Sequence, residues 1–550
     1  MSDGYVTCCV RHAQKCAVCT SALKEVWASG HSAEVVVLTT LRVRIARSIQ
    51  AFRNRRVQSK EHSEVQEFDL LVVGGGPGGY VAAIRAAQRG LAVGVVEKER
   101  PGGVCLNWGC IPTKAMLRSA EVYETVLHAA DFGVHVENVT IDYDTIRRRK
   151  SSVVKGLTDG VAGLLKSNGV TVINGHARFT GPTTVDVYAA GESPLGADGP
   201  RYAAEPAGAQ PIEQVKARDV IIATGSVPVQ LPLPGADLPG VITSDGAFGL
   251  TEVPKRIAII GGSAVGAEWA TLFATLGSEV SIIEMQKTLV PAEDVEVGKA
   301  LGRSFTKRGI KVLTEATVSR VDQAADGLKV TVDGAKPQQI DADVVLVGVG
   351  RKPNTASLDL DKAGVATSER GFITVDDKLR TNVEHVYAIG DVTGKALLAH
   401  VASHQGVVAA ETIAGHHAAI DYNVIPAATF THPEIASVGL TEAKAIEAGH
   451  EVVAAKFPFA ALGRAQSYGD TEGFLKIVAG KKYGEVLGVH IIGHSASDLI
   501  TEGALALALE ATLDELAETI HAHPTLGEIG MEAAMAALGL PIHVAPPKKR

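Results

Sequence analysis

The chain has 550 residues, which is too long for one hydrophobic core and predicts three or four domains. Hydrophobic residues make up 46% of the chain and charged residues 21%, as in soluble globular proteins, and a net charge of −8 argues against a nucleic-acid-binding surface. No apolar run approaches the roughly 18 residues that cross a bilayer, and no secretory signal opens the chain, so we expect a cytoplasmic protein without membrane or nucleic-acid partners.

Residues 1–66 differ from the rest of the chain in composition. They hold four of the six cysteines, namely Cys8, Cys9, Cys16 and Cys19. Cys16 and Cys19 have the CxxC spacing of a zinc site, but the adjacent Cys8 and Cys9 are awkward as the other two ligands, so we expect no metal. The arginine-rich end of the segment weakly resembles a transit peptide. We interpret the segment as a disordered extension or as the result of a start codon placed too early.

The first strongly patterned segment is 69–99, DLLVVGGGPGGYVAAIRAAQRGLAVGVVEKE. It predicts a strand, a glycine-rich turn, a helix and a second strand. In a GxGxxG turn, Gly74 makes the turn, Gly76 lets the backbone approach a pyrophosphate, and Gly79 lets the helix pack on the strand. The helix N-terminus adds N–H donors, and Glu97 would accept a hydrogen bond from a ribose hydroxyl. The segment therefore predicts a dinucleotide site.

A cysteine pair follows in residues 102–114, GGVCLNWGCIPTK. In an ideal helix Cys105 and Cys110 would lie about 140° apart, and their Cα atoms would exceed the roughly 7 Å limit for a disulfide. A disulfide needs a distorted turn, which Gly109 permits, and Pro112 suits an early helical position. Cys110 would then lie at a helix N-terminus, where the dipole favours the thiolate. Two buried, reduced cysteines are the competing interpretation, and this segment alone does not decide.

A β-rich stretch near 171–225 carries a Gly/Pro/Ala-rich insertion near 189–211, which predicts a surface loop. The segment 256–286, RIAIIGGSAVGAEWATLFATLGSEVSIIEMQ, then repeats the first pattern. Two copies predict two dinucleotide sites in one chain.

The second copy departs from the first at one position. Its motif reads Gly261, Ser263, Gly266, and the Cβ of Ser263 narrows the space for a pyrophosphate. Glu284 lies 23 residues after Gly261, as Glu97 does after Gly74. Because a carboxylate pairs with a ribose 2′-hydroxyl and repels a 2′-phosphate, we expect NAD rather than NADP.

The last region predicts a separate α+β domain. Strand patterns at 473–480 and 485–493 precede one long helical pattern at 496–521. His523 lies five residues before Glu528, and a carboxylate that holds an imidazole orients it as a base. A histidine near a glutamate is more often a surface or packing feature, so this pair is weak evidence by itself.

Several independent motifs now support a resemblance. They are VVGGGPGGYVAAIRAAQ, GGVCLNWGCIPTKAML, IIATGS, GGSAVGAEWA, GVGRKPNT, YAIGDV, LLAHVASHQG and HAHPTLGE. From about residue 68 to 541 the chain resembles the dihydrolipoyl dehydrogenases of the pyridine nucleotide–disulfide oxidoreductase family. The resemblance does not cover residues 1–66, and the loop near 189–211 looks longer than is usual for the family.

The resemblance implies an α/β fold with two Rossmann-like dinucleotide-binding domains, for FAD and NAD, and a C-terminal α+β dimerisation domain. It divides the chain into an N-terminal extension (1–66), the first part of the FAD-binding domain (67–250), the NAD-binding domain (251–375), an FAD/central region (376–423), the dimerisation domain (424–541) and a tail (542–550).

The resemblance also implies site residues. The expected FAD contacts are Gly74, Gly76, Gly79, Glu97, Lys98, Gly103, Lys114, Ala177, Thr224, Gly225, Ser226, Gly390, Asp391, Leu397, Leu398, Ala399 and His400. The expected NAD contacts are Gly261, Ser263, Gly266, Glu284, Val318 and Gly350. Lys114 is expected to approach the flavin and to pair with Glu268, and Asp391 to bind the ribityl chain. No metal is expected.

The implied activity is the oxidation of protein-bound dihydrolipoyl groups to lipoyl, with NAD⁺ reduced to NADH. In a homodimer, His523 of the partner subunit, oriented by Glu528, would take a proton from a dihydrolipoyl thiol. The thiolate would attack Cys105 of a Cys105–Cys110 disulfide, and Cys110 would pass electrons to FAD. The implied partners are lipoyl domains of 2-oxoacid dehydrogenase complexes, in which the chain would be the E3 component, or the H protein of the glycine cleavage system.

Four alternative functions compete with this one. A glutathione reductase usually prefers NADP, which Glu284 disfavours. A mercuric reductase usually carries a C-terminal cysteine pair, and this chain has no cysteine after Cys110. A soluble transhydrogenase lacks the redox cysteines, whereas this chain has Cys105 and Cys110. A flavoprotein scaffold without activity has Ser263 as its only support.

Overall fold

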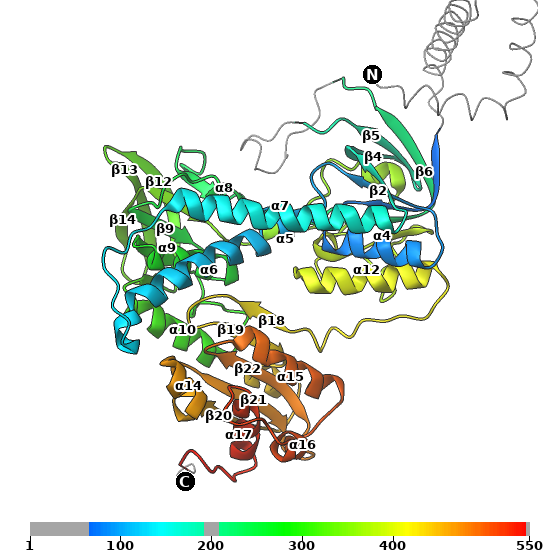
Figure 1. Ribbon diagram of the computed structural model, residues 1–550. Helices are drawn as coiled ribbons and strands as arrows, with labels where there is room; N and C mark the ends of the chain where they lie inside the picture. The colour runs from blue at the N-terminus through cyan, green and yellow to red at the C-terminus, as the bar shows by residue number, and fades with distance from the viewer. Residues whose placement is uncertain (1–64, 192–207, 546–550) are drawn as a thin grey trace, which may run out of the picture. The chain divides into compact units, whose positions relative to one another are not determined.

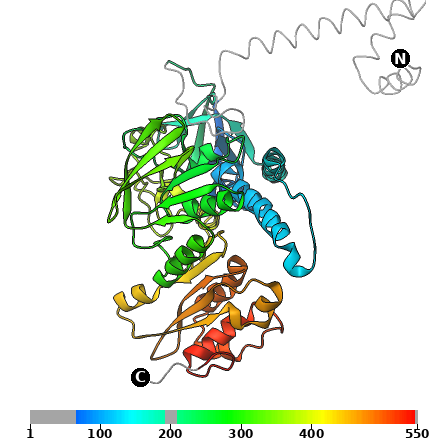
Figure 2. The same cartoon turned by 90° about the vertical axis from the view of Figure 1, so that its left-hand side faces the viewer.

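The computed structural model describes residues 65–191 and 208–545 (Figure 1). The expectations for residues 1–64, including the four cysteines there, and for most of the insertion near 189–211 lie outside the described residues. The orange-to-red C-terminal elements form a layer of their own in both views (Figures 1 and 2), below the elements drawn from blue to yellow-green.

The first dinucleotide-binding domain is built on a seven-stranded sheet. Its order is β3-β2-β1-β6-β5-β4, with β17 pairing β6, and β1 runs parallel to β2 and β6. Strand β17 returns to this sheet after the second domain, so the first domain is made of two separate stretches of chain. The strands are β1 (Gln66–Val73), β2 (Val93–Glu97), β3 (Thr171–Asn174), β4 (His176–Gly181), β5 (Thr184–Tyr188), β6 (Glu213–Ile222) and β17 (Val386–Ala388).

Small residues bring two helices of this domain into close contact. Ala82, Ala83 and Ala86 on α4 are fully buried, and a Cβ added at Gly406 of α12 would lie 2.5 Å from the carbonyl oxygen of Gly78. Backbone therefore meets backbone where α4 and α12 cross, beside the glycine-rich turn. The helices are α4 (Pro77–Gln88), α5 (Gly103–Trp108), α6 (Cys110–Leu127), η1 (Ala129–Phe132), α7 (Tyr143–Ser167), α11 (Leu360–Ala363), η2 (Gly390–Thr393) and α12 (Ala399–Ile413).

The second domain repeats the parallel design. Its five-stranded sheet has the order β11-β10-β9-β15-β8, and a three-stranded antiparallel sheet β12-β13-β14 accompanies it. A two-stranded sheet, β7 with β16, connects the two domains. The elements are β7 (Ser226–Pro228), β8 (Val241–Thr243), α8 (Ser244–Ala247), β9 (Arg256–Ile260), α9 (Ala264–Thr275), β10 (Glu279–Ile283), α10 (Val295–Lys307), β11 (Lys311–Leu313), β12 (Ala316–Ala324), β13 (Gly327–Gly334), β14 (Gln338–Ala342), β15 (Val344–Val347) and β16 (Arg351–Pro353).

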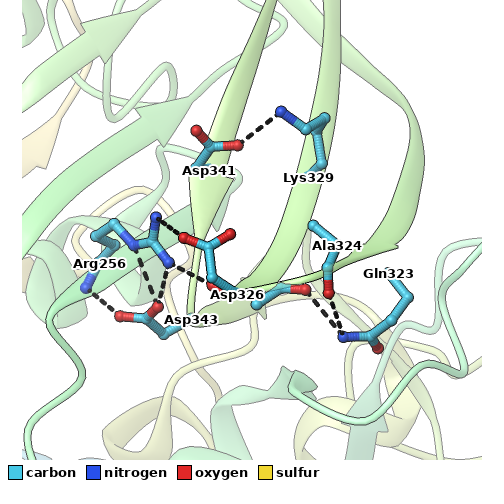
Figure 3. Close-up of polar contacts among 8 residues, drawn as sticks. Arg256, Gln323, Ala324, Asp326, Lys329, Asp341 and Asp343 are labelled. Carbon is cyan, nitrogen blue, oxygen red and sulfur yellow. Dashed lines mark hydrogen bonds and ion pairs between the residues drawn. The ribbon is translucent and has the colours of Figure 1, made fainter.

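Arg256 joins the two sheets of the second domain (Figure 3). Its backbone N–H and its guanidinium donate to the Asp343 carboxylate, at 2.9 Å and 2.6 Å, and Nη2 donates to the Asp326 carbonyl oxygen at 2.6 Å. Lys329 and Asp341 form a cross-strand ion pair of 2.9 Å between β13 and β14. Arg256 thereby ties the start of β9 to Asp326, the residue directly before β13 of the antiparallel sheet.

The C-terminal domain is an antiparallel sheet, β18-β19-β22-β21-β20, covered by helices. The strand patterns predicted at 473–480 and 485–493 are confirmed as β21 and β22. The elements are β18 (Ala427–Thr429), β19 (Ile435–Gly439), α13 (Glu442–Glu447), β20 (Val452–Pro458), η3 (Phe459–Ala461), α14 (Gly463–Tyr468), β21 (Phe474–Gly480), β22 (Val486–Ile492), α15 (Ala496–Ala508), α16 (Leu513–Glu518) and α17 (Glu528–Ala537).

The single helix predicted over 496–521 is wrong. Helix α15 ends at Ala508 and α16 begins at Leu513. Glu510 between them has φ +54°, which ends the helix, and Thr512 forms a capping box with Glu515 that starts a new one. The apolar period continues across the break because both helices contribute to the same hydrophobic core, α15 through Ile500 and α16 through Leu513 and Leu516.

The described residues contain neither a membrane-spanning helix nor a cluster of metal ligands. None of their helices combines the length and apolar character that membrane crossing requires. Their His, Cys, Asp and Glu side chains form no group of three or more that would suit a metal ion.

Candidate active site

A cavity of about 620 Å³ opens at the glycine-rich turn after β1. Its walls come from that turn, the starts of α5 and α6, the end of β6, η2 and the start of α12. Every expected FAD contact lines it except Gly79. These residues are Gly74, Gly76, Glu97, Lys98, Gly103, Lys114, Ala177, Thr224, Gly225, Ser226, Gly390, Asp391, Leu397, Leu398, Ala399 and His400.

The glycines of the first turn are required by close backbone contacts. Gly74 has φ +105°, and a Cβ there would lie 2.5 Å from the Ala223 carbonyl oxygen. Gly79 does not line the cavity. A Cβ added there would lie 1.8 Å from the Gly74 carbonyl oxygen. Gly79 thus lets α4 pack against the turn, while Gly76 leaves its cavity side open.

The Glu97 carboxylate holds the glycine-rich turn through two hydrogen bonds within the protein. Its carboxylate accepts N–H bonds from Gly75 at 2.6 Å and from Glu99 at 2.8 Å. Burial raises the pKa of Glu97, although those two N–H donors and Lys98 oppose the rise. Each oxygen keeps a second lone pair for a ribose hydroxyl.

The second turn, from Gly261 to Gly266, is held by the same kinds of contact as the first. Glu284 accepts from the N–H of Gly262 at 2.6 Å and of Gln286 at 2.8 Å, and a Cβ at Gly266 would lie 1.9 Å from the Gly261 carbonyl oxygen. Ser263, at φ −77° and ψ −174°, adopts nearly the same backbone as Gly76, at φ −69° and ψ −175°. The serine therefore changes the turn only by its side chain.

The other two expected NAD contacts lie near this second turn. Val318 is half-buried on β12, whose first residue, Ala316, donates its N–H to the Glu284 carbonyl oxygen at 3.0 Å. Gly350 follows β15 and has φ +121°.

The two cysteines meet at a break between helices. Cys105 lies in α5, Cys110 begins α6, and Gly109 between them has φ −138° and ψ −110°. A side chain at Gly109 would come within 2.9 Å of the Val104 carbonyl oxygen. The distorted turn that the spacing required is confirmed. Both sulfurs are free thiols here, and the residues line the cavity wall.

The two thiols have different acidities. Hydrogen bonding from Cys105, together with the charge of Lys114, lowers the pKa of Cys110, and burial only partly opposes this. The pKa of Cys105 is raised by its bond to Cys110 and by burial. Cys110 at the start of α6 is therefore the sulfur that carries the thiolate.

Lys114 lines the cavity and is held there by an ion pair with Glu268. Its Nζ lies 2.8 Å from both carboxylate oxygens, and 4.5 Å from the centre of the Phe430 ring. Glu268 also accepts the Phe430 N–H at 3.0 Å. The expected Lys114–Glu268 pair is present, and it brings the C-terminal domain to the cavity through Phe430, which the sequence did not single out.

A polar chain runs along the other wall. Ser226 Oγ donates to Asp391 Oδ2 at 2.5 Å and accepts from Arg351 Nε at 2.7 Å. Burial raises the pKa of Asp391, against the Ser226 hydrogen bond and the Arg351 charge. Arg351 was missed among the expected site residues, although it lies inside the GVGRKPNT motif.

Two buried polar atoms of the cavity wall have no hydrogen-bond partner within the described chain. They are Thr224 Oγ1 and Trp108 Nε1. Buried polar atoms are normally satisfied, so these two fit a bound group with polar atoms of its own. With the glycine turn and Glu97, this wall suits a large dinucleotide.

We expect Ser226→Ala to weaken FAD binding about tenfold. The variant leaves the Asp391 carboxylate and the Arg351 Nε without their shared partner, which costs about 1–3 kcal/mol. Titration of the apoprotein with FAD measures the change. Ser357→Ala is the matched control, because Ser357 also lines the cavity but its recorded bond, to His176, uses its backbone oxygen. Equal affinity of the Ser226→Ala protein and the unmodified protein would contradict the role of this chain of bonds.

His523 and Glu528 come together, but away from the cavity. His523 Nδ1 lies 2.8 Å from Glu528 Oε1, and Glu528 Oε2 accepts the Thr525 N–H at 2.8 Å. Burial raises the pKa of Glu528, but the Thr525 N–H and the imidazoles of His523 and His521 outweigh it and lower the pKa overall. The His523 side chain is 76% exposed and does not line the cavity of its own chain.

Comparison with known proteins places these features in a family. Residues 68–406 match the family model described as pyridine nucleotide-disulphide oxidoreductase, and residues 425–534 match its dimerisation domain. Dihydrolipoyl dehydrogenase of Chlamydia trachomatis is 44% identical over 486 residues, covering 88% of this chain and 100% of the relative. That of Geobacillus stearothermophilus is 46% identical, covering 87% of this chain and 98% of the relative. The mitochondrial one of Pisum sativum is 42% identical, covering 87% and 93%.

Solved structures agree with the family match. The crystal structure of LpdA from Mycobacterium tuberculosis superimposes with a TM-score of 0.75 at 28% identity, covering 86% of this chain and 99% of that one. A copper(II) complex of the flavoprotein disulfide reductase RclA from Escherichia coli gives a TM-score of 0.74 at 27% identity, with the same coverage.

Proposed function

The chain belongs to the pyridine nucleotide-disulphide oxidoreductase family, and from this we propose how its residues carry out the dihydrolipoyl dehydrogenase reaction. The activity rests on relatives of 41–46% identity over 87–88% of this chain. The observation that carries the assignment of residues is the cysteine pair at the α5–α6 break, on the wall of the large cavity.

The enzyme uses FAD and NAD. The chemistry that bound FAD supplies is the conversion of a dithiol's electron pair into hydride for NAD⁺. The cavity around Gly74 and Asp391 would hold FAD, and the turn around Gly261 with Glu284 would hold NAD.

The sulfur chemistry is assigned to Cys105 and Cys110. In the oxidised enzyme they form a disulfide. A dihydrolipoyl thiolate attacks Cys105, the Cys105–Cys110 bond breaks, and Cys110 leaves as a thiolate. The second dihydrolipoyl thiol then attacks the mixed disulfide, so that lipoyl leaves with its ring disulfide closed and Cys105 takes up a proton. The lowered pKa of Cys110 supports this order, because a sulfur of lower pKa is the better leaving group.

The proton of the attacking thiol goes to an imidazole. His523 is oriented by Glu528 through Nδ1, which leaves Nε2 as the base. Since His523 does not line the cavity of its own chain, we assign this role to His523 of the partner subunit in a homodimer. The dimerisation domain at 425–534 supports the homodimer.

The substrates proposed are lipoyl groups carried by proteins. The candidates are lipoyl domains of 2-oxoacid dehydrogenase complexes and the H protein of the glycine cleavage system, since both present the same dithiol arm. A cytoplasmic location is proposed from the small number of cysteines, which is unlike the disulfide frameworks of secreted proteins.

The function is tested by NADH formation from dihydrolipoamide and NAD⁺ with the purified, FAD-loaded protein. NADP⁺ in place of NAD⁺, glutathione disulfide with NADPH, and Hg²⁺ with NADPH are the competing reactions. We expect turnover with the first pair only. An FAD-loaded protein that reduces ferricyanide with NADH but forms no NADH from dihydrolipoamide would overturn the function, and turnover of none of these substrates would favour a flavoprotein scaffold.

A further inference from the structure

A second imidazole–carboxylate pair lies beside the first. His521 Nε2 lies 2.6 Å from Glu502 Oε1, and His521 Nδ1 lies 2.8 Å from the Thr519 carbonyl oxygen. The His521 side chain is 10% exposed, against 76% for His523 two residues later. One imidazole of the HAH sequence is therefore held inside the domain while the other is presented to its surroundings.

The two hydrogen bonds of His521 use both ring nitrogens. The Thr519 carbonyl oxygen only accepts, so the Nδ1–H group donates to it. Nε2 and the Glu502 carboxylate then share one hydrogen across 2.6 Å. The imidazole is therefore held from two sides, by the backbone of Thr519 and by the side chain of Glu502.

The His521–Glu502 pair also contacts the start of α17, which carries Glu528. Glu502 is on α15, and its Oε2 lies 3.0 Å from where a Cβ would stand at Gly530. The His521 ring lies 3.8 Å from the corresponding position at Gly527. Both partners of the pair thus lie against the glycines on either side of Glu528.

We propose that His521 and Glu502 are positioning residues that hold the segment between His521 and Gly530, so that Glu528 keeps His523 in its working orientation. His523 is mostly exposed, and residues 522–528 have three side-chain hydrogen bonds: Glu528 to His523, Glu528 to the Thr525 N–H, and Thr525 Oγ1 to the Ala522 carbonyl oxygen at 2.7 Å. Those bonds are all internal to residues 522–528. The His521–Glu502 bond joins that segment to α15, 19 residues earlier in the chain. The inference rests on the proposed role of His523.

The test compares three variants of the FAD-loaded enzyme. We expect Glu502→Ala to lower kcat for dihydrolipoamide at least tenfold, while the KM for NAD⁺ and the rate of ferricyanide reduction by NADH stay within twofold. Glu502→Gln should restore kcat to within threefold, because its amide N–H can donate to Nε2 of a neutral His521 while Nδ1–H still donates to Thr519. Glu447→Ala, which removes an exposed carboxylate from α13 in the same domain, should change nothing.

The outcomes separate this inference from the proposed function. If Glu502→Ala keeps the original kcat while His523→Gln loses it, the positioning role is wrong and the proposed function stands. If His523→Gln also keeps the original kcat, both are wrong. A Glu502→Ala protein that loses ferricyanide reduction together with dihydrolipoamide oxidation would also refute the positioning role, since the defect would then reach the flavin and NAD sites.

Discussion

Replacing Cys110 with serine should lower the rate at which dihydrolipoamide bleaches the flavin absorbance by at least about 1,000-fold. A hydroxyl forms no disulfide, so the attacking thiolate finds no S–S bond to break. Nor does serine supply the thiolate that Cys110 becomes under the influence of Cys105 and Lys114. Stopped-flow absorbance under anaerobic conditions measures the effect directly, without turnover of NAD⁺.

The controls for this variant separate sulfur chemistry from folding. Cys110→Ser should still bind FAD and should still reduce ferricyanide with NADH, because that route uses no protein sulfur. Its remaining Cys105 should form a mixed disulfide with added lipoamide, detectable as a mass increase of the intact protein. Flavin bleaching at the original rate in Cys110→Ser would remove the cysteine pair from the mechanism.

Replacing His523 with glutamine should lower kcat for dihydrolipoamide about 100- to 10,000-fold, the usual contribution of a positioned general base. Glutamine keeps a polar side chain of similar reach but takes up no proton in the working pH range. Glu528→Gln should cost less, about tenfold to 100-fold, because the imidazole remains and loses only the carboxylate that orients it at 2.8 Å. Steady-state rates with dihydrolipoamide and NAD⁺ measure both variants.

The proposed homodimer allows a second test of His523, in dimers that combine two different variants. If His523 of the partner subunit serves the cavity of the other chain, a mixed dimer of Cys110→Ser and His523→Gln chains retains one complete site. Mixing the two inactive variants under conditions that exchange subunits should then recover up to about one quarter of the original activity, as half of the dimers are mixed and each has one working site out of two. No recovery, in a mixture shown to contain mixed dimers, would contradict a base supplied by the partner.

Much of the site was predictable because its constraints are local in the chain. Gly74 and Gly79 are dictated by a turn that closes within six residues, and Gly109 by the break that brings two cysteines together five residues apart. Glu97 ends β2 and Glu284 directly follows β10, so the positions of both follow from strand and helix lengths. His523 and Glu528 are likewise five residues apart. In each case the residue type and the spacing indicate which local backbone geometry or side-chain contact is required.

Other contacts join residues that are far apart in the chain, and no spacing pattern in the sequence predicts them. Arg351 reaches Ser226 across 125 positions, and Ser226 reaches Asp391 across 165. Phe430 meets Lys114 only because the C-terminal domain packs there. The Lys114–Glu268 pair was expected from family resemblance rather than from any pattern in this chain. The helix predicted over 496–521 failed for a local reason instead, because its apolar period ran on through the Thr512–Glu515 capping box that starts a new helix.

The amino-acid sequence by itself determined the two glycine-rich turns and the spacing of the cysteine pair, because backbone sterics and short-range spacing act without the rest of the fold. The histidine with its carboxylate became a site only through the family resemblance, since the spacing alone was weak evidence. Only the tertiary structure decided which wall of the cavity carries Arg351, that Phe430 contacts Lys114, and that His523 stands outside the cavity of its own chain. The physical reason is that these features depend on packing between surfaces hundreds of residues apart, and the energy of that packing is not encoded at any single position.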